Sequence, residues 1–118
     1  MSKHRRERLG HELTQRLARI LEHRVSDPRL EGLTVVDVQA APDASFARVY
    51  YRTLGDREQA AEALEKAKPY IRRRLAEGLK VRRVPELDFR YDRAQDSGAR
   101  VDELLRELAE GRADEAED

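Results

Sequence analysis

The residues best suited to chemistry in this sequence are cations that gather in one stretch. Between residues 66 and 83 there are eight basic side chains and one acid, Glu77. The eight are Lys66, Lys68, Arg72, Arg73, Arg74, Lys80, Arg82 and Arg83. Guanidinium groups bind phosphate oxygens through paired hydrogen bonds, and ammonium groups bind them as point charges. The stretch therefore predicts a surface that binds the phosphate groups of a nucleic acid.

An apolar stripe at helical spacing runs through the same part of the chain. Its members are Ala60, Leu64, Ala67, Ile71, Leu75 and Leu79. Steps of three and four residues keep these side chains on one face of a helix, which predicts a helix that buries this face. Pro69 has no N–H for the carbonyl of Glu65, and its ring crowds that carbonyl. We therefore expect a helix–kink–helix unit whose kink lies at Ala67, Lys68 and Pro69.

Three consecutive arginines fan around the polar side of this unit, because neighbours on a helix are about 100° apart. Arg73 should point away from the apolar stripe. Arg72 and Arg74 should flank the buried edge, where their methylene groups can lie on the core while the guanidinium groups stay in water.

A second candidate surface is the strand predicted for residues 45–54. Alternation there sends Arg48, Tyr50 and Arg52 to one face and the apolar residues between them to the other. Two arginines around a tyrosine suit an RNA contact. Exposed arginines are also common on a half-buried strand, so the pattern fits either an RNA contact or a solvated face.

Nothing in the sequence indicates a catalytic or metal centre. The three histidines all lie in the first predicted helix or at its edge: His4, His11 and His23. No acid recurs beside them with the spacing of metal ligands. Asp88 and Asp92 share a strand face with Arg90 between them, which is typical of an exposed strand with balanced charges. Cysteine, a glycine-rich phosphate loop and a nucleophile motif are all missing, so we expect no enzyme, cofactor or metal.

Length and charge bound the class of protein. The 118 residues, 39% hydrophobic and 41% charged, suit one folded domain with solvated faces. Residues 1–84 carry 19 basic and 12 acidic side chains (+7), and residues 85–118 carry 5 and 12 (−7). This asymmetry predicts a basic body and an acidic tail. The tail either opposes non-specific nucleic-acid binding, or binds a basic protein, or only solubilises the chain. No apolar run reaches membrane-spanning length and no signal-peptide block follows the basic start, so we expect a cytoplasmic protein.

Hydrophobic periodicity and turn residues place the elements. We expect a helix at 5–23, strands at 33–40 and 45–54, helical pieces between 56 and 78, a strand at 86–92 and a short helix at 99–110. Asp27 and Pro28 predict a tight capped turn after the first helix. In the last strand Leu87, Phe89 and Tyr91 should face inward.

The order of these elements predicts an α+β fold. The helices must cover one face of a three-stranded sheet, giving a two-layer sandwich. The helical crossover between strands two and three is long enough to make them parallel. We expect residues 1–98 to form the domain and residues 99–118 to form a C-terminal short helix and an acidic, disordered tail.

Several separated motifs carry a family resemblance. They are Ser26-Asp27-Pro28-Arg29-Leu30, Leu33-Thr34-Val35-Val36-Asp37-Val38, Ala41-Pro42-Asp43, Ala47-Arg48-Val49-Tyr50, Val84-Pro85-Glu86-Leu87-Asp88-Phe89 and Gly98-Ala99-Arg100-Val101-Asp102-Glu103-Leu104-Leu105. In this order and spacing the chain resembles the ribosome-binding factor A family over about residues 5–108.

The resemblance implies a type II KH-like fold without a GxxG loop, and a kink between paired helices that is usually Ala-x-Gly. The matching residues are Ala67-Lys68-Pro69, so proline replaces the glycine. It also implies binding to the small (30S) ribosomal subunit late in assembly, contact with 16S rRNA near the decoding region, 5′-end maturation and growth in the cold. A GTPase assists release in this family, and we expect a monomer. The predicted RNA-binding residues are Arg48, Arg52, Lys66, Lys68, Arg72, Arg73, Arg74, Lys80, Arg82 and Arg83.

The alternative is a protein–protein adaptor or dimerisation module. Glu62 and Lys66, and Arg73 and Glu77, are spaced as i,i+4 ion pairs that would neutralise part of the basic stretch. Such exposed pairs contribute only about 0.3–0.5 kcal/mol each. Salt separates the two functions, because RNA binding through arginines weakens steeply as salt rises and an apolar protein interface does not.

Overall fold

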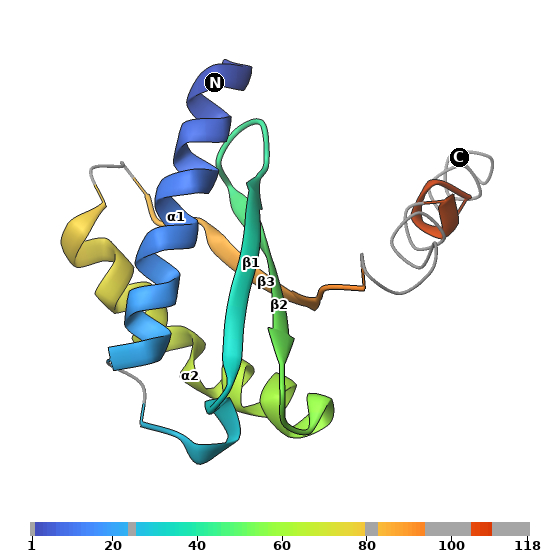
Figure 1. Cartoon of the computed structure of the whole chain (residues 1–118). Coiled ribbons are helices and arrows are strands. Elements are labelled where there is room, and N and C mark those ends of the chain that lie inside the picture. The colour runs from blue at the N-terminus through green and yellow to red at the C-terminus, as the bar shows by residue number, and fades with distance from the viewer. Residues whose placement is uncertain (1, 24–25, 80–82, 94–104, 110–118) are drawn as a thin grey trace.

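The structure is a computed structural model of the chain. It describes residues 2–23, 26–79, 83–93 and 105–109. Its elements are α1 (Lys3–His23), the 3₁₀ turn η1 (Pro28–Leu30), β1 (Leu33–Ala40), β2 (Phe46–Thr53), α2 (Arg57–Gly78) and β3 (Glu86–Tyr91) (Figure 1). The strands lie within one residue of the predicted bounds.

The three strands form a mixed sheet in the order β1-β2-β3. β1 and β2 are antiparallel, and β2 and β3 are parallel, as the length of the crossover predicted. The register between β1 and β2 shifts between Val35 and Asp37, so Val36 is an extra residue and its side chain is 42% exposed. Such a bulge bends an edge strand and hinders pairing with another chain.

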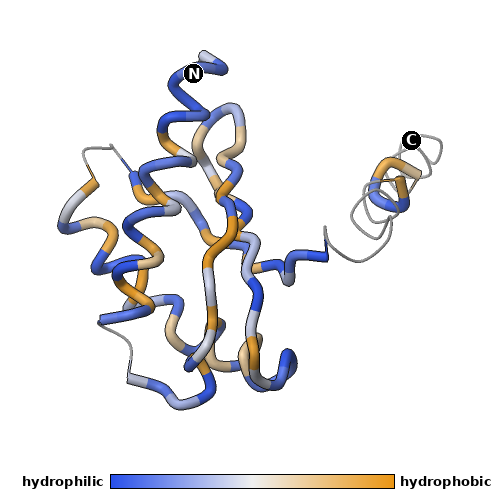
Figure 2. Tube along the Cα trace, viewed as in Figure 1, coloured by the Kyte–Doolittle hydropathy of each residue, from blue (hydrophilic) through white to orange (hydrophobic). Residues whose placement is uncertain are grey.

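Both helices lie on the same side of the sheet, so the molecule has two layers (Figure 1). The predicted α+β architecture is confirmed. Figure 2 shows apolar positions recurring between hydrophilic ones along α1. The core between the layers contains side chains that are fully buried, among them Leu13, Leu17, Val49, Leu64, Ile71 and Leu75. The predicted stripe of α2 and the inward face of β2 therefore meet in one core.

α1 begins two residues earlier than predicted because Ser2 caps it. The backbone N–H of Arg5 donates to the Ser2 hydroxyl at 3.2 Å, and that of Arg6 donates to the Ser2 carbonyl at 3.0 Å. A serine in this position satisfies N–H groups that the first turn leaves without partners.

The predicted helix–kink–helix unit is assigned as one helix. α2 runs from Arg57 to Gly78 with Pro69 inside it, and Lys68 is helical. Leu64 and Ile71, on either side of the proline, are both fully buried against the core. Burial of these two side chains stabilises the helix at the point where proline cannot donate a backbone hydrogen bond.

The capped turn after α1 is present as predicted. The carboxylate of Asp27 accepts the backbone N–H of Arg29 at 2.9 Å and also pairs with the Arg29 guanidinium at 2.9 Å. The side-chain and backbone hydrogen bonds from Arg29 lower the pKa of the Asp27 carboxyl. The ion pair thus fixes the path from α1 into β1.

Two side chains differ from the predicted alternation. Asp92 was expected to face outward, but it is only 4% exposed, and its N–H donates to the Tyr51 carbonyl at 2.7 Å. This bond continues the β2–β3 pairing past the end of β3 at Tyr91. Tyr50, expected on the solvated face, is 9% exposed although it is not part of the core cluster.

The described part of the C-terminal segment, residues 105–109, is helical, in agreement with part of the helix predicted at 99–110. Glu107 pairs with Arg48 at 3.4 Å and with Arg90 at 3.5 Å, so this segment touches the sheet face that the helices leave uncovered. The predicted boundary at residue 98 and the tail from residue 110 lie outside the described residues. No helix in the described ranges is long and apolar enough to cross a membrane.

Candidate nucleic-acid interface

α2 presents most of the predicted phosphate-binding side chains. Asp56 caps the helix, because its carboxylate accepts the N–H of Gln59 at 2.9 Å. Burial of the stripe, with Ala60, Leu64 and Ile71 fully buried, then turns the charged positions between its members toward the surface.

Three of the predicted cations are exposed: Lys66, Arg73 and Arg83. Within the described ranges none of them forms an ion pair shorter than 4.0 Å, although the Arg73 guanidinium lies 6.0 Å from the ring centre of Tyr70. Hydrogen bonds from Ser45 in the β1–β2 turn lower the pKa of the Asp43 carboxyl, and the charge of Arg83 adds to this effect. These three side chains can bind an anion without first breaking an ion pair.

Lys68 and Arg74 are half-buried and already paired on their own helix. The Lys68 ammonium lies 2.9 Å from a Glu65 carboxylate oxygen, and the Arg74 guanidinium lies 3.2 Å from Glu77. Pairs of this kind are weak, so a phosphate could replace either carboxylate.

Arg72 has a structural contact in addition to its charge. Its guanidinium donates to the Val84 carbonyl at 3.1 Å and pairs with Glu86 at 3.3 Å. Its Nε is buried and has no hydrogen-bond partner among the described residues. Arg72 therefore ties α2 to the segment that enters β3, and of the three consecutive arginines it is the least free to bind RNA.

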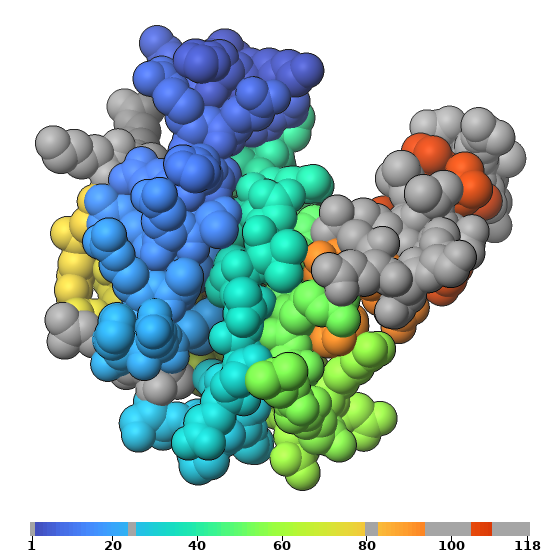
Figure 3. All heavy atoms as spheres, viewed as in Figure 1, coloured from blue at the N-terminus to red at the C-terminus, as the bar shows by residue number. Residues whose placement is uncertain are grey.

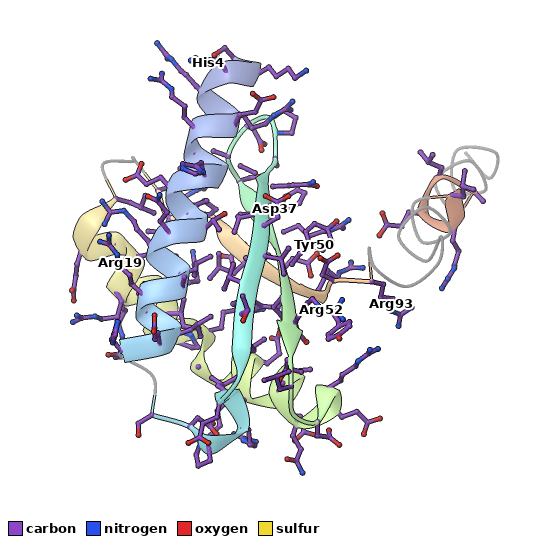
Figure 4. The ribbon with its side chains drawn as sticks, in the orientation of Figure 1. His4, Arg19, Asp37, Tyr50, Arg52 and Arg93 are labelled. Carbon is purple, nitrogen blue, oxygen red and sulfur yellow. The ribbon has the colours of Figure 1, made fainter. Side chains whose placement is uncertain are left out.

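The arginines of β2 lie on the face of the sheet opposite the helices. Arg48 pairs with Asp88 at 3.2 Å and with Glu107 at 3.4 Å. Burial opposes its charge, but hydrogen bonds to Tyr50 and Asp88 outweigh that cost, so the pKa of the Arg48 guanidinium is raised. Arg52 donates to the Asp92 carbonyl at 2.8 Å and lies 5.4 Å from the Tyr91 ring centre. Both arginines are therefore held by neighbouring residues. Figure 4 shows Arg52 and Tyr50 near each other on β2.

Sequence reasoning missed the basic side chains of α1 that face α2. Arg16, Arg19 and His23 line a groove of about 390 Å³ together with Arg74, over the apolar side chains of Ile20 and Leu75. In Figure 3 the last turns of α2, in yellow, border α1, in blue. The sequence signal was that Arg16, Arg19 and His23 are three and four positions apart, beside the apolar stripe of α1. This spacing indicates a binding site only once it is known how α1 and α2 cross.

Comparison with known proteins decides the family. The family model described as ribosome-binding factor A matches residues 5–105. The chain belongs to the ribosome-binding factor A family.

Relatives named ribosome-binding factor A align with nearly the whole chain. The protein of Syntrophomonas wolfei is 45% identical over 115 residues, which are 93% of this chain and 94% of that protein. The protein of Streptococcus mutans is 39% identical over 112 residues, covering 92% and 97% of the two chains.

Solved structures of ribosome-binding factor A share the fold. The crystal structure of the Thermus thermophilus protein aligns with a TM-score of 0.72 at 34% identity, covering 75% of this chain and 97% of that one. A homology model of the Thermus thermophilus factor, fitted into the cryo-electron microscopy map of a 30S complex, aligns with a TM-score of 0.67 at 33% identity, covering 77% and 99%.

Of the residues predicted to contact RNA, Lys80 and Arg82 lie outside the described ranges. Most of the described ones form two groups. The cations of α2 are on the helical layer, and Arg48 and Arg52 are on the sheet layer. Arg83 lies in the segment between α2 and β3. The described ranges contain no cluster of three or more side chains that could hold a metal ion.

Proposed function

We propose that this chain is a non-catalytic ribosome assembly factor of the cytoplasm. It binds the immature small (30S) ribosomal subunit and supports late maturation of 16S rRNA, including processing of its 5′ end. The observation that carries the proposal is the family match over residues 5–105. Likeness to a Thermus thermophilus factor fitted into a map of a 30S complex supports the choice of subunit.

Exposed cations of α2 and of the segment that follows it suit recognition of folded RNA by shape. Lys66, Arg73 and Arg83 would contact phosphate and ribose oxygens, which position a protein on RNA without reading its bases. A base-stacking platform has little support, since Tyr51 is buried and packs edge-to-face on Tyr91, with ring centres 5.9 Å apart. The predicted contacts are therefore electrostatic.

The other predicted RNA-binding residues would contribute less to RNA binding. Lys68, Arg74 and Arg48 would exchange a carboxylate partner for a phosphate, whereas Arg52 would keep its backbone contact. Lys80 and Arg82 enter the proposal from their place in the sequence alone. The factor would act as a monomer, leave the subunit with the help of a GTPase, and matter most for growth in the cold.

Co-sedimentation with purified ribosomal particles tests the function. The chain should pellet with free 30S subunits and not with translating ribosomes. Reversing the two exposed charges in Lys66→Glu/Arg73→Glu should abolish pelleting with 30S subunits while the circular dichroism spectrum stays unchanged. Arg72 is left intact because its bond to Val84 makes it part of the fold.

Salt dependence separates the assembly factor from the adaptor. Binding to 30S subunits through several phosphates should weaken linearly in a plot of log affinity against log salt. A wild-type chain that does not bind 30S subunits at low ionic strength would contradict the proposed function.

A further inference from the structure

The groove between α1 and α2 is lined by basic side chains from both helices. α1 contributes Arg16, Arg19 and His23 to it, and α2 contributes Arg74. We propose that this groove is a binding site for consecutive phosphodiester groups of the ribosomal RNA backbone. The inference rests on the proposed function and adds α1 to the interface, which the basic run of α2 alone does not include.

The spacing on α1 suits a nucleic acid strand. Arg16, Arg19 and His23 follow one another at intervals of three and four residues, so they project from one face. From Arg16 to His23 the helix rises about 10 Å, enough to follow more than one phosphate of a strand. Arg74 closes the groove from the other helix, so a phosphate in it would be held from two directions.

Arg16 and Arg74 each form an ion pair with an acid that lies outside the groove. Glu12 accepts from Nε of Arg16 at 3.0 Å, and Glu77 lies 3.2 Å from Arg74, but neither carboxylate lines the groove. Each pair joins residues three or four positions apart on one helix, and such exposed pairs contribute only about 0.2–1 kcal/mol. They orient the guanidinium groups at little cost to phosphate binding.

Arg19 is the arginine of the groove that is most available to a ligand. It is exposed and makes no ion pair with any residue in the described ranges. Figure 4 shows it on the side of α1 that faces α2. Glu22 is an acid on the same part of α1, and its carboxylate lies 3.7 Å from the His23 ring. The floor is formed by Ile20 and Leu75, which are 7% and 0% exposed, so it offers a phosphate no competing acid.

Gly78, at the end of α2, leaves room for the guanidinium of Arg16. A β-carbon on Gly78 would overlap Nη1 of Arg16, so the guanidinium lies directly over the glycine. The C-terminal end of a helix carries a partial negative charge, which also favours a cation there. Gly78→Ala therefore displaces Arg16 while it leaves every charge of the chain in place.

The test compares binding to purified 30S subunits across a salt series from about 50 to about 300 mM. The double variant Arg19→Gln/Arg74→Gln should raise the Kd about tenfold or more and reduce the log–log salt slope by about 1 to 2. Arg93→Gln removes a charge on the opposite side of the molecule (Figure 4) and should change neither quantity. Gly78→Ala should also raise the Kd, and thermal unfolding of each variant reports its folding.

The possible outcomes distinguish an error in the proposed groove from an error in the proposed function. If wild type binds 30S subunits and the double variant binds equally well with the same slope, the groove is not the phosphate site, although the proposed function stands. If the double variant binds more weakly with an unchanged slope, the groove contacts a ribosomal protein instead of RNA. If Arg93→Gln weakens binding as much as the double variant, net charge and not the groove decides affinity. If wild type does not bind, the function itself is wrong.

Discussion

Gly10 of α1 and Val38 of β1 lie so close that a β-carbon on Gly10 would fall 2.5 Å from the Val38 carbonyl oxygen. That distance is well inside the van der Waals contact of carbon and oxygen, so only glycine fits without movement of the backbone. Glycine inside a helix costs about 1 kcal/mol relative to alanine. The chain accepts this cost where it brings α1 against β1 and buries Leu9 and Leu13.

Gly10→Ala should therefore destabilise the fold by about 1–3 kcal/mol, as overpacked sites do, although helix propensity alone favours alanine. Urea denaturation measures the change. Gly55→Ala is the matched control, because a β-carbon there would meet its nearest neighbour, Thr53 Oγ1, at 3.7 Å. Equal stability of Gly10→Ala and wild type would mean that α1 does not approach β1 this closely.

Arg72 and Arg73 are neighbours with the same charge and should respond differently to the same substitution. Arg72→Gln breaks the ion pair with Glu86 and the charged hydrogen bond to the Val84 carbonyl, which should lower stability by about 1–2 kcal/mol. Arg73→Gln alters an exposed side chain and should leave the melting temperature unchanged within about 1 °C. If both variants melt like wild type, Arg72 does not tie α2 to the start of β3.

Asp27 should make stability depend on pH. Its carboxyl has a lowered pKa in the folded chain because Arg29 donates side-chain and backbone hydrogen bonds to it. A lowered folded pKa stabilises the fold above the unfolded value of about 3.9, and that stabilisation is lost as the pH falls through the folded pKa. Wild type should therefore melt above Asp27→Asn at pH 7, and the gap should shrink below about pH 4.

Arg29→Gln provides the control for this pH effect, since it removes the partner and leaves the carboxyl in place. Like Asp27→Asn, it should make the loss of stability between pH 7 and pH 3 smaller than in wild type. A gap between wild type and Asp27→Asn that stays constant from pH 7 to pH 3 would assign the effect of Asp27 to backbone capping alone.

Periodicity predicted the apolar stripe of α2 and the inward-facing residues of β2 because burial in these elements follows local repeats. Leu75 of the α2 stripe and Val49 of β2 are both fully buried. It did not predict the environment of Asp92, which lies beyond the last residue of β3. There a bond to the Tyr51 carbonyl continues the pairing with β2, and no repeat within residues 86–92 encodes that contact.

The candidate interface was predictable only where it lies within one stretch of sequence. Counting charges found Lys66 and Arg73, which the structure leaves exposed. It could not show that Arg48 pairs with Asp88 and Glu107, because those partners are 40 and 59 positions away. The place of Arg19 beside α2 likewise depends on how the two helices cross.

Pro69 lies inside one continuous helix, at the place where the sequence predicted a kink between two helical pieces. Proline inside a helix removes one hydrogen bond and costs about 3 kcal/mol relative to alanine. The sequence therefore predicted two helical pieces, whereas the structure assigns one helix from Arg57 to Gly78. Buried neighbours on both sides, Leu64 and Ile71, supply the packing that offsets the cost.

Substitution of Pro69 measures whether the helix tolerates proline or needs it. Pro69→Ala restores an N–H that can donate to the Glu65 carbonyl, and since Pro69 is exposed the lost ring removes little packing. Pro69→Gly restores the same donor with a helix propensity about 1 kcal/mol poorer than that of alanine. If proline is only tolerated, urea denaturation should rank stability as alanine, then glycine, then wild type. The stiffness of proline in the unfolded chain is worth about 0.4–1 kcal/mol, too little to reverse that order. A wild type more stable than both variants would mean that Leu64 and Ile71 reach the core only along the backbone path that proline imposes.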